Sequence, residues 1–315
     1  MKKLYKLCGI FALLVPLAIA GCDRKPAEAA DDRPVVVATT TMLADLGEQI
    51  GGEQVRVEGI MSPGGDPHLY QPTPADARLV AQSDLVIKSG LKLEGWIDDL
   101  LDNAGGTRPS VVASDGIQPI RMEGFKGGVD PHFWFEIAAW KIAANNVGDA
   151  LVELVGAETE EGRQIQARLE EHLAELDHLD QWIRDELETI PRDQRVLVTS
   201  HDAFNYFGRA YEIDVVGIQG VSTDEDASQR DVANIIELVR ERNAPAVFVE
   251  TSVNPALIKQ VAKETGAEVA GPLYSDSIGA SDGPAGTFTA TVVENVRMVT
   301  EALGGQHTPF SPDKS

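Results

Sequence analysis

The sequence predicts an α/β protein made of two doubly wound parallel-sheet lobes with a long helix between them. Short β-branched runs alternate with helical segments in both halves of the chain, which is typical of right-handed crossovers and parallel sheets. The segment between the halves carries one apolar stripe at helical spacing. The chain has 315 residues, which is long enough for two lobes.

Residues 1–21 are expected to form a signal segment that is removed. A lysine-containing start precedes the apolar stretch Leu7 to Ala20, which is too short for a free membrane-spanning helix but suits a signal core. Small residues directly before Cys22 resemble a bacterial lipobox, which predicts cleavage there and lipid on Cys22. An ordinary signal peptide with an incidental cysteine is the alternative. The expected location is extracytoplasmic, either the periplasm or the outer face of the cytoplasmic membrane.

Residues 22–33 are polar and alanine-rich, and we expect a flexible tether there. The other cysteine, Cys8, lies in the signal segment, so the exported chain has no disulfide framework. The net charge of −23 disfavours nucleic acid and anionic lipid as partners. We expect a monomer, attached to the membrane only through its lipid.

The first lobe is expected over residues 34–157. Thr73 is the expected N-cap of its first helix. β-branched and apolar runs predict the strands, and apolar periodicity predicts the helices. The expected strands are Val35–Ala38, Val55–Ile60, Leu85–Lys88 and Ser110–Ala113, and the expected helices are Pro74–Gln82 and Ile137–Val155.

The second lobe is expected over residues 192–315, and it repeats the alternation of strands and helices. The expected strands are Arg195–Thr199, Asp214–Ile218, Ala246–Glu250 and Glu268–Ala270. The expected helices are Ala203–Tyr211, Asp231–Arg242, Pro255–Thr265 and Phe288–Leu303.

A linker helix is expected over residues 158–191. Apolar residues recur there at spacings of three and four, and Pro191 ends the pattern. A kinked helical hairpin is the alternative, but no glycine or proline interrupts the stripe, which favours one long helix. His172 and His178 lie on this segment and are expected at the surface, and His307 is expected in a loose tail.

The chemistry-bearing pattern is a repeated tripeptide, Asp66-Pro67-His68 and Asp130-Pro131-His132. Proline stiffens its own backbone and that of the residue before it, so each histidine is held in a restrained loop. His201 follows a strand, and ligands of parallel sheets gather at the carboxyl ends of strands. Three restrained imidazoles predict a site for a first-row divalent metal ion.

Each histidine also has an ordinary structural interpretation. His68 would then be a surface loop residue, and His132 a core residue hydrogen-bonded to the backbone. His201 would be a bystander to helix capping by Ser200 or Asp202.

A fourth ligand is needed if the site is closed. Asp276 and Glu250 both follow or end a strand, and spacing leaves the choice between them open. The acidic loop 224–226 is expected to be solvated.

Enzyme signatures are missing. The sequence has no Gly-x-Ser-x-Gly elbow, no phosphate loop and no His-Glu-x-x-His helix. We therefore expect a binding protein that is not an enzyme. A zinc hydrolase with Glu250 as base is one alternative, and a surface adhesin is another.

These motifs together resemble a known family, the zinc/manganese solute-binding lipoproteins of bacterial metal ABC transporters, or TroA-like metal receptors. The resemblance covers nearly all of residues 35–303. It rests on five segments: Gly65-Asp66-Pro67-His68, Asp130-Pro131-His132-Phe133-Trp134, Thr199-Ser200-His201-Asp202-Ala203-Phe204, Val249-Glu250-Thr251-Ser252-Val253-Asn254-Pro255 and Leu273-Tyr274-Ser275-Asp276-Ser277-Ile278-Gly279.

The resemblance implies a rigid linker helix, a metal in the cleft between the lobes, and an ABC permease as partner. It places the metal ligands at His68, His132, His201 and Asp276, and it leaves Glu250 as a residue behind the ligands. It also implies one bound metal ion as transported cargo.

Zinc is favoured over manganese. Three imidazoles and one carboxylate suit tetrahedral zinc, whereas manganese-selective members are expected to have a carboxylate where this chain has His201. Two features leave room for manganese or for broad specificity. A bidentate Asp276 would raise the coordination number, and the segment between His68 and His132 lacks the histidine-rich loop of many zinc members.

Two expectations concern release of the metal. The ordinary histidine pKa of about 6.5 predicts that zinc leaves below about pH 6. A long uninterrupted helix between the lobes should resist wide hinge motion, so we expect a local loop shift around His201 or Asp276.

Overall fold

A computed structural model describes residues 31–122, 128–224 and 227–312. Residues Arg33–Ser315 form one compact unit. The expected signal segment and Cys22 lie outside the described residues. No helix within the described ranges is long and apolar enough to cross a membrane.

The first half contains a four-stranded parallel sheet in the order β2-β1-β3-β4. It agrees with the predicted strands and adds two helices, α1 and α3, that were not predicted. Thr40 caps α1, whereas α3 is short and lacks a side-chain cap. The strands are β1 (Val35–Ala38), β2 (Arg56–Gly59), β3 (Leu85–Lys88) and β4 (Ser110–Val112), and the helices are α1 (Thr41–Gly51), α2 (Pro74–Ala81), α3 (Ile97–Ala104) and α4 (Ile137–Val155).

The second half contains another four-stranded parallel sheet, in the order β6-β5-β7-β8. This is the same order as in the first half, so the two sheets share one topology and their carboxyl ends carry equivalent loops. The strands are β5 (Val196–Thr199), β6 (Asp214–Gly217), β7 (Ala246–Glu250) and β8 (Glu268–Leu273), and the helices are α6 (Asn205–Tyr211), α7 (Gln229–Arg242), α8 (Ala256–Thr265) and α9 (Phe288–Ala302).

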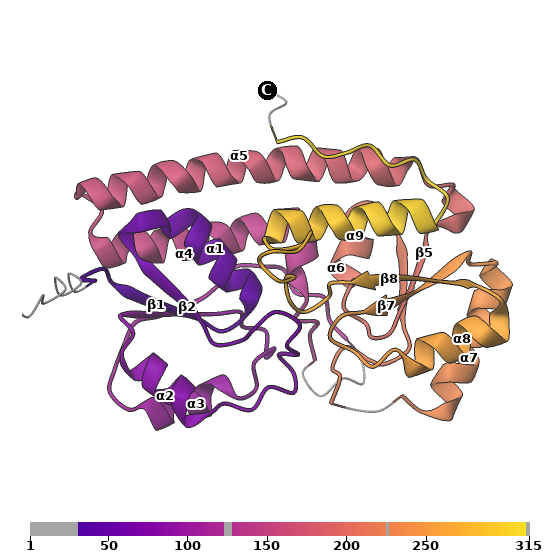
Figure 1. Ribbon diagram of the computed structural model, residues 1–315, viewed down its shortest axis with the longest axis horizontal. Helices are drawn as coiled ribbons and strands as arrows, with labels where there is room; N and C mark the ends of the chain where they lie inside the picture. Colours follow the sequence, from indigo (N-terminus) through magenta and orange to yellow (C-terminus); the bar gives the residue numbers. More distant parts are fainter. Residues whose placement is uncertain (1–30, 123–127, 225–226, 313–315) are drawn as a thin grey trace, which may run out of the picture. The chain divides into compact units, whose positions relative to one another are not determined.

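One helix, α5 (Glu160–Glu188), follows the first half and precedes the second. Its 29 residues correspond to about 43 Å of helix. It contacts α1 and α4 of the first half and α6 and α9 of the second, and it runs above both sheets (Figure 1). The single long helix is therefore confirmed, and the helical hairpin alternative is wrong.

The prediction that His172 lies at the surface is wrong. His172 is only 7% exposed, because it falls three residues after Leu169 and four before Leu176, on the buried stripe of α5. Its Nε2 has no hydrogen-bond partner among the described residues. His178 is exposed, as predicted.

The prediction of a loose tail around His307 is also wrong. The Nδ1 atom of His307 lies 2.9 Å from Oε2 of Glu186 on α5. The backbone N–H of Thr308 donates to Oε1 of the same carboxylate at 2.7 Å, and the indole of Trp182 donates to the Thr308 carbonyl at 2.9 Å. Glu186 is buried, so these bonds hold the tail against α5.

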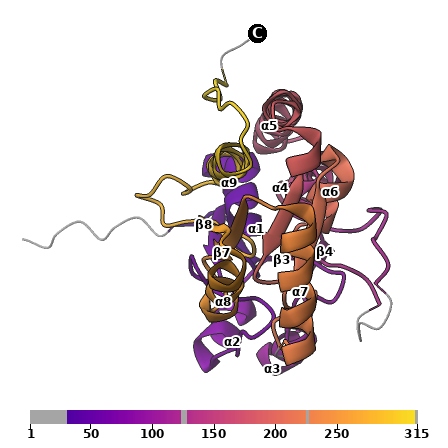
Figure 2. The same ribbon diagram turned by 90° about the vertical axis from the view of Figure 1, so that its right-hand side faces the viewer.

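A single apolar cluster runs through both halves. It contains buried residues of both sheets together with the inward faces of α1, α4, α5 and α9, for example Ile87, Leu151, Leu179, Phe248 and Val296. The helices α1, α4, α5 and α9 gather on one side of the sheets, whereas α2, α3, α7 and α8 lie on the other side (Figure 2). The two halves therefore share a core above the sheets, while the loops at the strand ends are left to build a site.

Candidate metal centre

The four side chains predicted as ligands lie together. His68 comes from the loop after β2, His132 from the segment just before α4, His201 from the loop after β5, and Asp276 from the loop after β8. One ligand atom from each lies within 4.8 Å of all the others. No other cluster with metal-ligand spacing occurs among the described residues.

The ligand atoms face one another. The Nε2 atoms of His68 and His132 are 3.2 Å apart. One carboxylate oxygen of Asp276, Oδ1, lies 3.5 Å from Nε2 of His132, and the other, Oδ2, lies 3.5 Å from Nε2 of His201. Three imidazole nitrogens and a carboxylate thus point at one common position.

A cation fits this position. Nε2 of His201 and Oδ1 of Asp276 are buried and have no hydrogen-bond partner within the described ranges. Buried polar atoms are normally paired. A divalent ion bound as cargo would satisfy both atoms at once, and the nitrogen-rich donor set suits a first-row metal.

Both Asp-Pro-His tripeptides form the same turn. Oδ1 of Asp66 accepts the backbone N–H of His68 at 2.8 Å, and Oδ1 of Asp130 accepts that of His132 at 2.9 Å. This Asx-type bond and the intervening proline restrain each histidine. The two aspartates differ in a second contact, because Oδ2 of Asp66 accepts the hydroxyl of Thr223 at 2.6 Å, from the second half.

Two carboxylates stand behind the buried histidines. Oδ1 of Asp130 lies 2.8 Å from Nδ1 of His132, and Oε2 of Glu250 lies 2.5 Å from Nδ1 of His201. Each carboxylate accepts the Nδ1 proton and leaves Nε2 to face the common position, as in metal sites where a carboxylate orients the ligating histidine. Glu250 therefore contacts the outer side of His201, whereas Asp276 faces the cluster.

Sequence reasoning missed the groups that orient Asp276. Its Oδ2 accepts the hydroxyl of Ser252 at 2.8 Å and that of Ser275 at 3.1 Å. Ser252 lies in the segment after β7, so only the folded chain brings it to Asp276. Asp224 is exposed and outside the cluster, and the rest of the acidic loop is outside the described residues.

The three histidines of the site differ in the direction of their pKa shifts. Burial lowers the pKa of His68 to about 4, and the neighbouring His132 acts in the same direction. Burial also acts to lower the pKa of His132, but the carboxylates of Asp130 and Asp276 outweigh it and raise the pKa to about 9. For His201, burial is outweighed by the charges of Glu250 and Asp276, and its pKa lies well above the ordinary value.

The carboxylate shows the complementary shift. Burial acts to raise the pKa of Asp276, but the charges on His201 and His132, whose Nε2 atoms lie 3.5 Å from its carboxylate oxygens, hold it well below its usual range. Without metal, the raised pKa values of His132 and His201 and the lowered pKa of Asp276 favour charged rings beside a charged carboxylate. The ordinary histidine pKa does not apply at this site.

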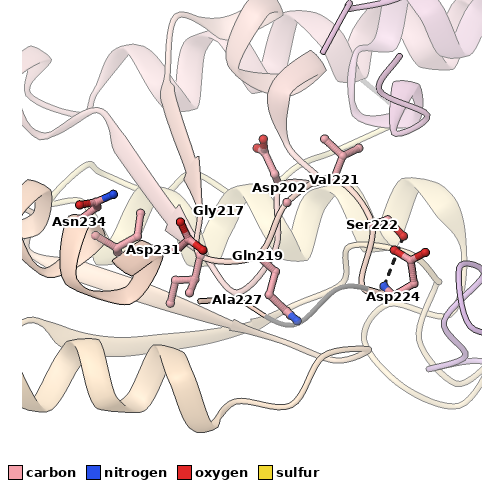
Figure 3. Close-up of a pocket in the computed structure, with 12 residues that line it drawn as sticks. Asp202, Gly217, Gln219, Val221, Ser222, Asp224, Ala227, Asp231 and Asn234 are labelled. Carbon is pink, nitrogen blue, oxygen red and sulfur yellow. Dashed lines mark hydrogen bonds between the residues drawn. The ribbon is translucent and has the colours of Figure 1, made fainter. Parts of the chain in front are cut away.

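A polar cavity of about 420 Å³ lies beside the His201 loop. Its lining comes from the loops after β5 and β6 and from α7, and it includes Asp202, Gln219, Asp224, Asp231 and Asn234 (Figure 3). These acidic groups do not approach one another with metal-ligand spacing. The cavity therefore adds no second ion site.

Comparison with known proteins agrees with the resemblance to metal-binding receptors that the sequence motifs indicated. The family model described as "ZnuA: Zinc-uptake complex component A periplasmic" matches residues 36–302. The manganese-binding lipoprotein MntA of Bacillus subtilis is 37% identical over 299 residues, covering 92% of this chain and 97% of MntA. The zinc-binding protein TroA of Treponema pallidum is 35% identical over 283 residues, covering 87% and 90%.

The fold has solved counterparts. The structure of the periplasmic zinc-binding protein TroA from Treponema pallidum matches with a TM-score of 0.81 and 33% identity, covering 86% of this chain and 99% of that one. This match confirms the fold of two parallel-sheet lobes with a linker helix. Other relatives in sequence are named iron-binding protein and manganese ABC transporter substrate-binding lipoprotein, so the names of the relatives include different metals.

Proposed function

The chain belongs to the family of periplasmic zinc-uptake components, as its motifs predicted, and on that premise we propose that it delivers zinc to an ABC importer. In this role it is an extracytoplasmic receptor that captures one ion and presents it to a membrane permease. The family consists of solute-binding receptors rather than enzymes. This confirms the prediction of a binding protein that is not an enzyme. The hydrolase alternative is therefore dropped.

The convergence of four protein ligand atoms is the observation that carries this proposal. His68, His132, His201 and Asp276 would hold the ion with no position left for water, and closed sites bind rather than catalyse. The donor set of three nitrogens and one oxygen favours tetrahedral zinc. Two hydroxyls already bond Oδ2 of Asp276, which supports coordination through Oδ1 alone.

Manganese, or a broad range of metals, is the second candidate. Relatives of similar identity are named for manganese and for iron. Both oxygens of Asp276 lie near the histidines, and a bidentate carboxylate would give the higher coordination number that manganese accepts.

The remaining organisation is also a proposal. Residues 34–157 and 192–315 would act as lobes on either side of the linker 158–191. Cys22 would carry lipid, with residues 22–33 as the tether of a monomeric receptor. Several relatives are named lipoproteins, which supports an anchored, extracytoplasmic location.

Metal competition tests the proposal. Residues 23–315 are stripped of metal and equilibrated with zinc and excess manganese, and bound atoms are counted by elemental mass spectrometry. One zinc per chain is expected, and Asp276→Ala should abolish its retention while the control Asp224→Ala keeps it. Retained manganese would establish the second candidate, and a wild-type chain that holds neither metal would contradict both.

A further inference from the structure

We propose that Trp134 is a positioning residue that ties the Asp276 loop to the His132 loop and so sets the spacing of these two ligands. The inference rests on the proposed function, because it concerns how the same site is held ready for its ion. Trp134 belongs to the short 3₁₀ turn Phe133–Phe135, directly after His132.

The contact joins the two halves of the molecule. The indole N–H of Trp134 donates to the backbone carbonyl of Ser275 at 2.8 Å. Ser275 immediately precedes Asp276, and Trp134 lies two residues after His132. A movement of either loop away from the other therefore has to break this bond.

Trp134 has little freedom to move. It is 3% exposed, and its ring lies edge-on to those of His132 and Phe133, with centroids 5.2 Å and 5.8 Å away. A buried indole N–H needs an acceptor, and the Ser275 carbonyl supplies it. The same side chain thus packs against one ligand and bonds the loop of another.

The Asp276 loop has two more bonds to the first half. The N–H of Gly64, in the loop that carries His68, donates to the hydroxyl of Ser277 at 2.8 Å. The N–H of Ile278 donates to the hydroxyl of Thr41 on α1 at 3.0 Å. Although Asp276 follows a strand of the second half, its loop is bonded to both loops that carry the first two histidines.

His201 is attached differently. Its ring and backbone are held by Glu250, on β7 of its own half. The loops of His68 and His132 are therefore each bonded to the Asp276 loop. Trp134 makes the bond between the loops of His132 and Asp276, and both of these ligands are buried. A metal-free site held in this way needs less rearrangement on binding.

The chain offers a matched control. Trp140 on α4 is 1% exposed and stacks on Phe288 with centroids 4.3 Å apart, but its Nε1 has no hydrogen-bond partner in the described part of the chain. Trp134→Phe and Trp140→Phe remove the same atoms from buried sites, but only the first breaks a hydrogen bond.

The first experiment measures zinc release into excess chelator and the affinities for zinc and manganese, for the mature chain and both variants. We expect Trp134→Phe to release zinc at least about tenfold faster, in the range seen when groups behind metal ligands are lost, and Trp140→Phe to stay within about twofold of wild type. The ratio of zinc to manganese affinity should change only in Trp134→Phe, since a general loss of stability would weaken both metals alike.

Equal release rates and equal affinity ratios in the two variants would overturn the inference. A wild-type chain that binds no zinc would instead contradict the proposed function, so the two failures are distinguishable. If Trp134→Phe does not fold, hydrogen exchange of the Trp134 indole proton in the metal-free wild type tests whether the hydrogen bond to Ser275 is present before metal binds. Slow exchange supports a tie that exists before metal binds, and exchange as fast as in a free indole overturns it.

Discussion

Glu250 holds His201 through both of its carboxylate oxygens. Oε1 accepts the backbone N–H of His201 at 2.9 Å, and Oε2 lies 2.5 Å from its Nδ1. Both residues are buried. The imidazole therefore has one orientation and one nitrogen available to an ion, which is the role of a carboxylate behind a metal-bound histidine.

Replacing Glu250 by glutamine should weaken zinc binding by about 10–100-fold without changing the stoichiometry of one ion. The amide keeps the shape of the side chain but removes the negative charge that raises the basicity of His201. Competition titration against a chelator of known affinity measures the change. Glu237→Gln, on the exposed side of α7, is the control, and equal affinities in the two variants would show that Glu250 does not act on the site.

Zinc binding at neutral pH should release about two protons per ion. The pKa of His132 is raised to about 9 and that of His201 lies well above its ordinary value, so both rings carry a second proton at neutral pH in the metal-free site. His68, with a pKa of about 4, is already neutral. Zinc must displace both protons, and the apparent affinity should fall by about two orders of magnitude per pH unit as the pH is lowered through neutrality.

Calorimetry in buffers of different ionisation enthalpy counts these protons directly. The expected decline begins well above the pH 6 inferred from an ordinary histidine, because the carboxylates stabilise the charged rings. Affinity that stays level from pH 9 to pH 7 would mean that His132 and His201 are neutral in the metal-free protein.

Gly148→Ala should destabilise the protein by about 1–3 kcal/mol through overpacking. A Cβ at Gly148 on α4 would lie 2.6 Å from Cδ2 of Leu169 on α5, and Leu169 is itself buried. Gly47→Ala on α1 is the control, because its Cβ would meet its nearest neighbours at 3.4 Å and alanine favours a helix by about 1 kcal/mol. Urea unfolding of the metal-free chain measures both, and a Gly148→Ala protein as stable as Gly47→Ala would refute close packing of α4 on α5.

Glu186→Ala should free the C-terminal segment from α5. The change removes the acceptor for Thr308 and the partner of His307, and lost buried hydrogen bonds of this kind cost about 1–3 kcal/mol. Limited proteolysis followed by mass spectrometry should show faster cleavage within residues 304–312 than in Glu171→Ala, a change on the exposed face of α5. Equal cleavage in both would mean that the segment does not depend on Glu186.

Much of the fold could be predicted because its signals are local. Alternating β-branched runs and helical periodicity located the strands of both sheets, and the uninterrupted stripe from Ile165 identified α5. The helices α1 and α3 were not predicted: α1 begins three residues after the strand signal of β1 ends, and α3 has only eight residues and no side-chain cap. His172 is buried although it is polar, because it lies between Leu169 and Leu176 on the apolar face of α5.

Part of the candidate site could also be predicted from the sequence. Proline beside His68 and His132 indicated restrained imidazoles, and a strand end indicated His201. Spacing alone could not choose between Asp276 and Glu250, because both follow or end strands. The structure turns Asp276 toward the histidines and Glu250 to the outer side of His201; that the four residues bind a metal ion stays a prediction.

The sequence by itself determined the strands, most of the helices, the parallel arrangement of the strands and the residue types from which the site is built, because propensity, periodicity and proline act over a few residues. Only the tertiary structure decided which carboxylate faces the cluster, that His201 carries a raised pKa, and that Trp134 bonds Ser275. Each of these depends on groups more than forty residues apart in sequence, and burial and hydrogen bonds between such groups exist only once the two sheets share a core.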